Sequence, residues 1–165
     1  MSDVSIRFED AAFRDLASRA PAIFQGELVP AVTEASMFAE REVKERAPTS
    51  GAGTLRDSIG ALPIQISGAA ITGGVGTSLS YAAAVELGSR PHWAPLAPLL
   101  EWVQRKLGLS GEEAEAAAQS IQYKIAARGT EGVFMFRDGF AAVTPFVLEL
   151  LGAATARAAG KMSAG

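Results

Sequence analysis

The sequence contains no cysteine and a single histidine, His92. The absence of cysteine excludes disulfides, a thiol nucleophile and metal sites built from thiolates, and it fits a protein made in a reducing cytoplasm. With one histidine, a transition-metal site would need carboxylates for its other ligands. We therefore expect no metal and no cofactor, and we expect His92 to serve the structure or an interface.

The sequence also lacks long apolar runs and clustered basic residues. We find no run of about 18 apolar residues, and no basic segment followed by an apolar one after Met1, so we expect no membrane span and no signal peptide. The 15 basic residues are scattered, and the net charge is −3. Because phosphate binding needs clustered lysine and arginine, we expect no sequence-specific nucleic-acid partner.

Motifs that carry catalytic chemistry are nearly absent. A Ser-His-Asp triad would have to use His92, but no G-x-S-x-G elbow accompanies it. The glycine-rich run 73–78 lacks the lysine of a P-loop. Glu112, Glu113 and Glu115 fit the acidic start of a helix better than a general acid and base. We predict that the protein is not an enzyme, with a small hydrolase using His92 as the distant alternative.

The 165 residues are 48% hydrophobic and 20% charged. This length is enough for one ordinary core, so we predict a single domain over residues 1–165. Residues 4–8 alternate weakly and could form a strand, and residues 11–20 indicate a brief helix. A longer helix is predicted from Pro21 to Arg46, with Pro30 kinking or splitting it.

Two patterns support this longer helix. Val32, Ser36, Ala39 and Val43 form one stripe at helical spacing. Glu40 with Lys44, and Glu42 with Arg46, are acid-before-base pairs four residues apart on the outer face.

Three strands are predicted after the helix. Apolar residues alternate over 62–66 and again over 71–75, with Gly68 between them, which indicates a hairpin. Pro63 cannot donate to a strand ladder and marks an edge or a strand start. Alternation of Tyr81, Ala83 and Val85 against Ala82, Ala84 and Glu86 predicts the third strand of an antiparallel meander.

Helices are predicted for the rest of the chain. Residues 91–132 read as a helical insertion, in which Ser110 to Glu113 form a capping box for the second helix. A last helix starts at Thr144 and Pro145 and runs to about Ala159, and residues 160–165 are expected to fray. The predicted fold class is α+β: a long N-terminal helix and C-terminal helices packed on a small antiparallel β-sheet.

Residues 75–90, which we call the signature segment, resemble the signature of the tail-completion and head-tail joining proteins of long-tailed bacteriophages. The residues that carry the likeness are Val75, Gly76, Thr77, Tyr81, Val85, Glu86, Gly88 and Arg90. Residues 47–59 resemble the helix-to-strand junction of the same family, with a longer turn that lacks the usual acidic residue. Residues 90–109 and 125–132 resemble a branch with a helical insertion. The likeness covers roughly residues 20–150.

The resemblance implies a structural virion protein of the neck, which completes the tail and joins it to the DNA-filled head. Its expected partners are a tail terminator and a head-closure or connector ring, and it would itself form a homo-oligomeric ring after synthesis in the host cytoplasm. A terminator or head-closure subunit is the close alternative. The residues predicted at a partner contact are Trp93, Phe134, Met135, Phe136 and Arg56, with core burial equally open for the aromatic residues and Met135.

Two further expectations concern the same region. The loops 48–54, 88–95 and 129–139 are expected to be mobile until they dock. Glu86 and Arg90 are expected to share a charge-assisted contact, with each other or across a subunit boundary.

Overall fold

The computed structural model describes residues 11–49, 54–68 and 70–164, and the side chains from Arg14 onward. The strand predicted for residues 4–8 lies outside the described residues. The helices are α1 (Ala11–Arg46), α2 (Thr54–Ser58), α3 (Ala82–Leu87), α4 (Leu96–Leu107), α5 (Gly111–Arg128) and α6 (Met135–Ser163). The strands are β1 (Gly60–Ala61), β2 (Gln65–Ser67), β3 (Ala70–Thr72), β4 (Val75–Gly76), β5 (Gly88–Ser89) and β6 (Thr130–Glu131).

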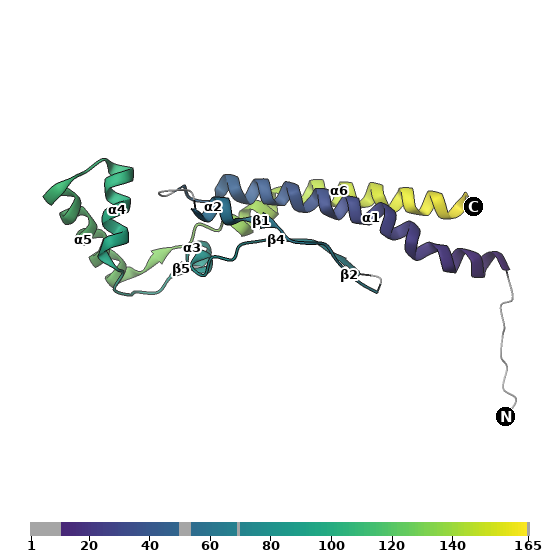
Figure 1. The fold of residues 1–165 in the computed structure, drawn as a ribbon, viewed down its shortest axis with the longest axis horizontal. Coiled ribbons are helices and arrows are strands. Elements are labelled where there is room, and N and C mark those ends of the chain that lie inside the picture. Colours follow the sequence, from purple (N-terminus) through teal and green to yellow (C-terminus); the bar gives the residue numbers. More distant parts are fainter. Residues whose placement is uncertain (1–10, 50–53, 69, 165) are drawn as a thin grey trace, which may run out of the picture. The chain divides into compact units, whose positions relative to one another are not determined.

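The strands of the described residues form three antiparallel pairs, β1 with β4, β2 with β3, and β5 with β6. The α+β class is confirmed, since long helices near both ends of the chain accompany these small sheets (Figure 1). The third strand of the predicted meander is wrong, because residues 82–87 form α3. Alanine has the highest helix propensity, and an alanine-rich run fits both a two-residue and a helical period.

The hairpin is interrupted at Pro63. Three residues, Leu62–Ile64, separate β1 from β2, whereas only Gly73 and Gly74 separate β3 from β4. The arm that carries Pro63 therefore has one extra residue, as in a β-bulge. Proline has no N–H to donate, so the break in pairing falls where the sequence predicted a strand edge or start.

Helix α1 is a single helix of 36 residues, so its predicted division at Pro21 is wrong, and Pro30 does not split it. Proline at position 30 leaves the carbonyl of Gly26 without its helical donor. Gly26 is exposed, so water can replace the missing N–H. The predicted stripe is confirmed at Ala39 and Val43, which are buried.

Helix α6 starts at Met135, earlier than the predicted start at Thr144, and it contains Pro145. It continues through Ser163, beyond the predicted end near Ala159. Its most apolar window has a mean hydropathy of 1.5, and 17% of that window is buried. By length and composition alone this helix could cross a membrane.

The described residues form two compact units. Unit 1 contains α1 up to Ala35, residues 63–73 and α6 from Pro145 onward. In unit 1, α1 and α6 lie side by side, with the buried small side chains Ala31, Ala154 and Ala158. Glu27 of α1 forms ion pairs with Arg157 and Lys161 of α6, which join the two helices.

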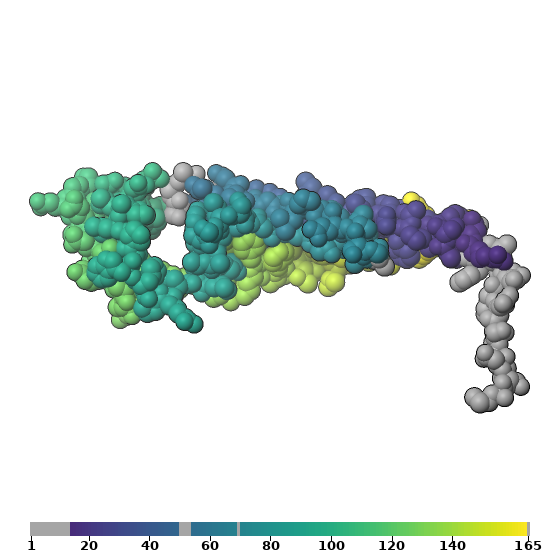
Figure 2. All heavy atoms as spheres, turned by 60° about the horizontal axis from the view of Figure 1, so that its bottom comes forward, coloured from purple at the N-terminus to yellow at the C-terminus, as the bar shows by residue number. Residues whose placement is uncertain are grey.

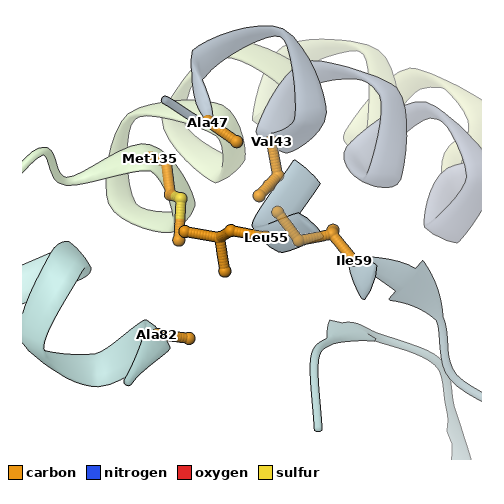
Figure 3. Packing of buried hydrophobic residues seen from close by; sticks show 6 residues of the cluster. All are labelled: Val43, Ala47, Leu55, Ile59, Ala82 and Met135. Carbon is orange, nitrogen blue, oxygen red and sulfur yellow. The ribbon is translucent and has the colours of Figure 1, made fainter. Parts of the chain in front are cut away.

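Unit 2 contains residues 36–62 and 74–144. Its core brings together α1, α2, α3 and the start of α6 (Figure 3). The buried core residues are Val43, Ala47, Leu55, Ile59, Ala82 and Met135. Full burial of a Val, Leu, Ile or Met side chain stabilises a fold by about 1.5–3 kcal/mol, so Val43, Leu55, Ile59 and Met135 contribute most to holding the short elements in place.

The insertion, residues 91–132, has a small core of its own within unit 2. Val103 of α4 and Ala114 and Ala118 of α5 are fully buried against each other's helices. Ser110 stands at the N-cap of α5, but its side chain makes no capping hydrogen bond. The predicted capping box is therefore wrong, and apolar packing pairs the two helices instead.

Candidate functional site

The first residues of the signature segment contact β1 and α2 in unit 2. Val75 and Gly76 pair with Ala61 and Gly60 of β1. The Thr77 hydroxyl lies 2.6 Å from the Ser58 hydroxyl of α2, and it accepts a hydrogen bond from the Leu79 N–H at 3.2 Å. These contacts fix the chain that leads into α3.

Helix α3 has one side in the core and one side uncovered. Val85 packs against the core cluster beside buried Ala82. Leu87 is 70% exposed, and Tyr81, at the N-cap of α3, is 46% exposed. The signature segment therefore presents large apolar side chains next to a rigid core.

Glu86 caps the start of α6. Its two carboxylate oxygens accept hydrogen bonds from the N–H groups of Phe136 at 2.9 Å and Arg137 at 3.0 Å. The first N–H groups of a helix have no partner within the helix, and a carboxylate there also meets the positive end of the helix dipole. Glu86 therefore links α3 to α6 in one subunit.

The predicted contact between Glu86 and Arg90 is absent from the ion pairs of the described residues. Sequence reasoning missed the cap because the donors lie about 50 positions further along the chain.

Close backbone approach joins the insertion to the rest of unit 2. Gly88, with φ of 79°, pairs with Glu131, and a Cβ on Gly88 would lie 2.3 Å from the Thr130 carbonyl oxygen. A Cβ on Gly129 would lie 1.9 Å from the Ser89 carbonyl oxygen. Only glycine fits these positions, and at Gly88 both the positive φ and the close steric contact require it.

Arg90 and His92 lie at the base of the insertion. Both are exposed, and the His92 Nδ1 atom lies 3.0 Å from the Arg90 carbonyl oxygen and 3.4 Å from the Ser89 hydroxyl. Over the described residues, no three His, Cys, Asp or Glu side chains are grouped to hold a metal ion. The contacts of His92 are those of a loop residue.

Trp93 is the most exposed of the predicted aromatic contact residues. Its ring is 61% exposed and packs edge-on against Tyr123 of α5, with ring centroids 5.3 Å apart. The neighbouring Ala94 is buried, and its carbonyl accepts a 2.6 Å hydrogen bond from the buried Gln122 amide. The backbone is thus fixed while the Trp93 and Tyr123 rings remain accessible.

The predicted loop 129–139 contains β6 and the first residues of α6, joined by residues 132–134. Phe134 has a positive φ of 55°, and the Arg137 guanidinium lies 3.8 Å from the centroid of its ring. Met135 is fully buried in the core, and Phe136 packs against that core. Burial in the core was the alternative that the sequence left open for Met135, and Met135 is buried. Arg56 is exposed on α2.

The comparisons with known proteins concern the first half of the chain. Residues 11–88 match the family model described as "Bacteriophage HK97-gp10, putative tail-component". This part of the chain is similar to that family of phage tail components. The match confirms the resemblance to a phage tail family, and it contains most of the signature segment but ends before the insertion. No curated protein and no solved structure matches this chain.

Proposed function

We propose that this tail component acts at the neck of the virion, where it completes the tail and joins it to the DNA-filled head. The observation that carries the proposal is the family match over residues 11–88. The finer assignment to the neck is supported by the residues of the signature segment, which resemble tail-completion and head-tail joining proteins.

The surface of unit 2 supports a role in binding other proteins. Trp93, Tyr123 and Leu87 are each more than 60% exposed, and Tyr81 is partly uncovered. Tryptophan and tyrosine are enriched among the residues that dominate protein interfaces. Such side chains on a fixed backbone are suited to docking without large rearrangement.

The proposed role needs no catalytic residue. A structural subunit acts through its surfaces, and a homo-oligomeric ring requires that one surface of the subunit bind a different surface of the next. We propose such a ring, with a terminator and a head-closure or connector ring as its neighbours. The uncovered apolar side of α6, on which Leu148 is 66% exposed, is expected to face protein in this assembly.

Electron microscopy of a lysate from a phage that lacks this gene tests the proposal. We expect tails of normal length and DNA-filled heads that fail to join. Overlong tails would assign the protein to the terminator instead, and heads that have lost their DNA would assign it to head closure. Normal virions would overturn the structural role.

A further inference from the structure

One side of α5 is not covered in the subunit. Ala114, Ala118 and Gln122 are buried, and they share one side of the helix because they are four residues apart. α4 and α5 pack into one body, which Figure 2 shows in space-filling form. The side of α5 that faces away from this packing is exposed, and the residues on it include Glu112, Glu113, Ala116, Ser120, Tyr123 and Lys124.

The charges on this side are separated along the helix. Glu112 and Glu113 lie in the first turn of α5, whereas Lys124 lies near its end. None of the three side chains forms an ion pair with another described residue. Glu113 and Lys124 are about 16 Å apart along the helix axis, at ~1.5 Å per residue, so they cannot pair within one chain.

A second copy of α5, laid antiparallel on the first, supplies the missing partners. Its Lys124 lies opposite Glu113 of the first copy, and its Glu113 lies opposite Lys124, so one twofold axis forms both pairs. Glu113 and Lys124 share one edge of the exposed side, because the sequence distance between them is close to three full helical turns. The charges of α5 are therefore complementary to those of a second α5.

The residues between the two charged ends permit close contact. Ala116 and Ser120 lie near the middle of the exposed side, and their small side chains allow the axes of two helices to approach. Tyr123 is 64% exposed beside them, and its ring packs edge-on against Trp93. A second α5 would remove the Tyr123 ring from water.

We propose that two copies of the free protein pair through antiparallel α5 helices, held by Glu113 and Lys124 of each copy. A twofold pair uses the same surface on both copies, whereas a larger ring needs two different surfaces. The pairing therefore belongs to the protein before it enters a virion, and it does not depend on the proposed place at the neck. It keeps Tyr123 covered until another neighbour replaces the second copy.

Sedimentation of the purified full-length protein at low ionic strength tests the proposal. We expect a dimer that dissociates as salt is added, because salt screens exposed charges. Glu113→Lys and Lys124→Glu should each weaken dimerisation about tenfold or more, since each places like charges opposite one another in both pairs. Glu101→Lys is the matched control, because it makes the same change of charge on an exposed residue of α4. It should leave the dimer intact, and an equal loss for Glu101→Lys would contradict the proposal.

A mixture of the two α5 variants tests the antiparallel arrangement itself. When a Glu113→Lys chain meets a Lys124→Glu chain, every charge in the two pairs faces an opposite charge. Equal amounts of the two variants should therefore form a dimer although neither variant does so alone, which also shows that both are folded. A mixture that stays monomeric would overturn the proposal. A natural protein that is monomeric at low ionic strength, or that forms assemblies larger than a dimer, would also overturn it.

Discussion

At the scale of single residues, Glu86 shows how one side chain of the signature segment stabilises the subunit. Its carboxylate is the cap of α6, and it connects that helix to α3. The sequence-based expectation was a contact of Glu86 and Arg90 with each other or across a subunit boundary. The cap makes Glu86 part of the fold.

Glu86→Ala removes both acceptor oxygens, and we expect a loss of roughly 1–2 kcal/mol in the free energy of unfolding, the usual cost of a lost cap. Chemical denaturation of the purified protein measures this loss. Arg90→Ala is the control, because Arg90 is exposed, and it should change stability by less than about 0.5 kcal/mol. Equal effects of the two variants would show that the cap does not stabilise the fold.

Glu27 gives unit 1 a pH dependence. Hydrogen bonds from Lys161 and Arg157 hold the pKa of its carboxyl below the ordinary value of 4.5. A lowered pKa in the folded state means that the stabilisation is complete above pH 4.5 and is lost as the pH falls through the folded-state pKa.

Glu27→Gln should therefore lower the melting temperature at pH 7, and the difference from the natural protein should shrink as the pH is lowered below 4.5. Thermal unfolding across this range provides the measurement. Glu149→Gln, at an exposed position of the partner helix α6, should show no such difference. A difference for Glu27→Gln that stays constant with pH would contradict the assigned cause.

At the scale of elements, the two glycines Gly139 and Gly152 of α6 have opposite surroundings. A Cβ on Gly139 would lie 2.8 Å from the Val43 Cγ2 atom and 3.1 Å from the Val43 backbone. A Cβ on Gly152 would meet nothing within 4 Å. Close packing of α6 on α1 in unit 2 therefore depends on Gly139.

Gly139→Ala should destabilise the protein by about 1–3 kcal/mol because it overpacks the contact with Val43. Gly152→Ala should stabilise it by up to about 1 kcal/mol, because alanine is the better helix former. Urea denaturation of both variants compares the effects. If both variants changed the free energy of unfolding in the same direction, helix propensity alone would determine their stability. That result would contradict the close packing of Gly139 on Val43.

The sequence predicted a helix or strand correctly where the spacing of its residues fitted one period. It failed where an alanine-rich run fitted both the helical period and the two-residue period of a strand. The pairs Glu40–Lys44 and Glu42–Arg46 are both present, with 2.6 and 2.7 Å contacts. The alanine-rich run 82–84 was assigned to a strand although it is helical.

Prolines were interpreted as helix starts at Pro21 and Pro145, but both lie inside helices. Tertiary packing of the helix on both sides of the proline outweighed the free-energy cost of proline inside a helix. The sequence around a proline does not reveal such packing.

For the candidate site, the sequence identified the segment but not the contacts. Gly88 has the positive φ that its residue type allows, and Trp93, for which burial was the open alternative, is exposed. The donors to Glu86, the crossing of Gly129 with Ser89 and the burial of Met135 all depend on residues 40 or more positions away. Contacts at such separations are set by the packing of the whole unit rather than by local spacing.

At the scale of the whole molecule, the insertion and α6 both lie outside the residues of the family match. The exposed Trp93 and Tyr123 rings of the insertion stand on a backbone fixed by Gln122. We propose that this surface contacts a neighbour in the virion.

Trp93→Ala should leave the folded protein nearly as stable, with a loss of about 0.5–1.5 kcal/mol from the ring contact, yet reduce the yield of joined virions. Complementation of a phage that lacks the gene, followed by plaque counts, measures the yield. Leu107→Ala is the control, since Leu107 is 53% exposed at the C-terminal end of α4. Equal yields for the two variants would remove Trp93 from the contact.

The central claim is that this tail component is located at the neck. Gold-labelled antibodies against the purified protein, applied to virions with partly opened necks and viewed by electron microscopy, test it most directly. The account predicts label at the junction of head and tail. Label confined to the distal tail, or virions that contain none of the protein, would contradict it.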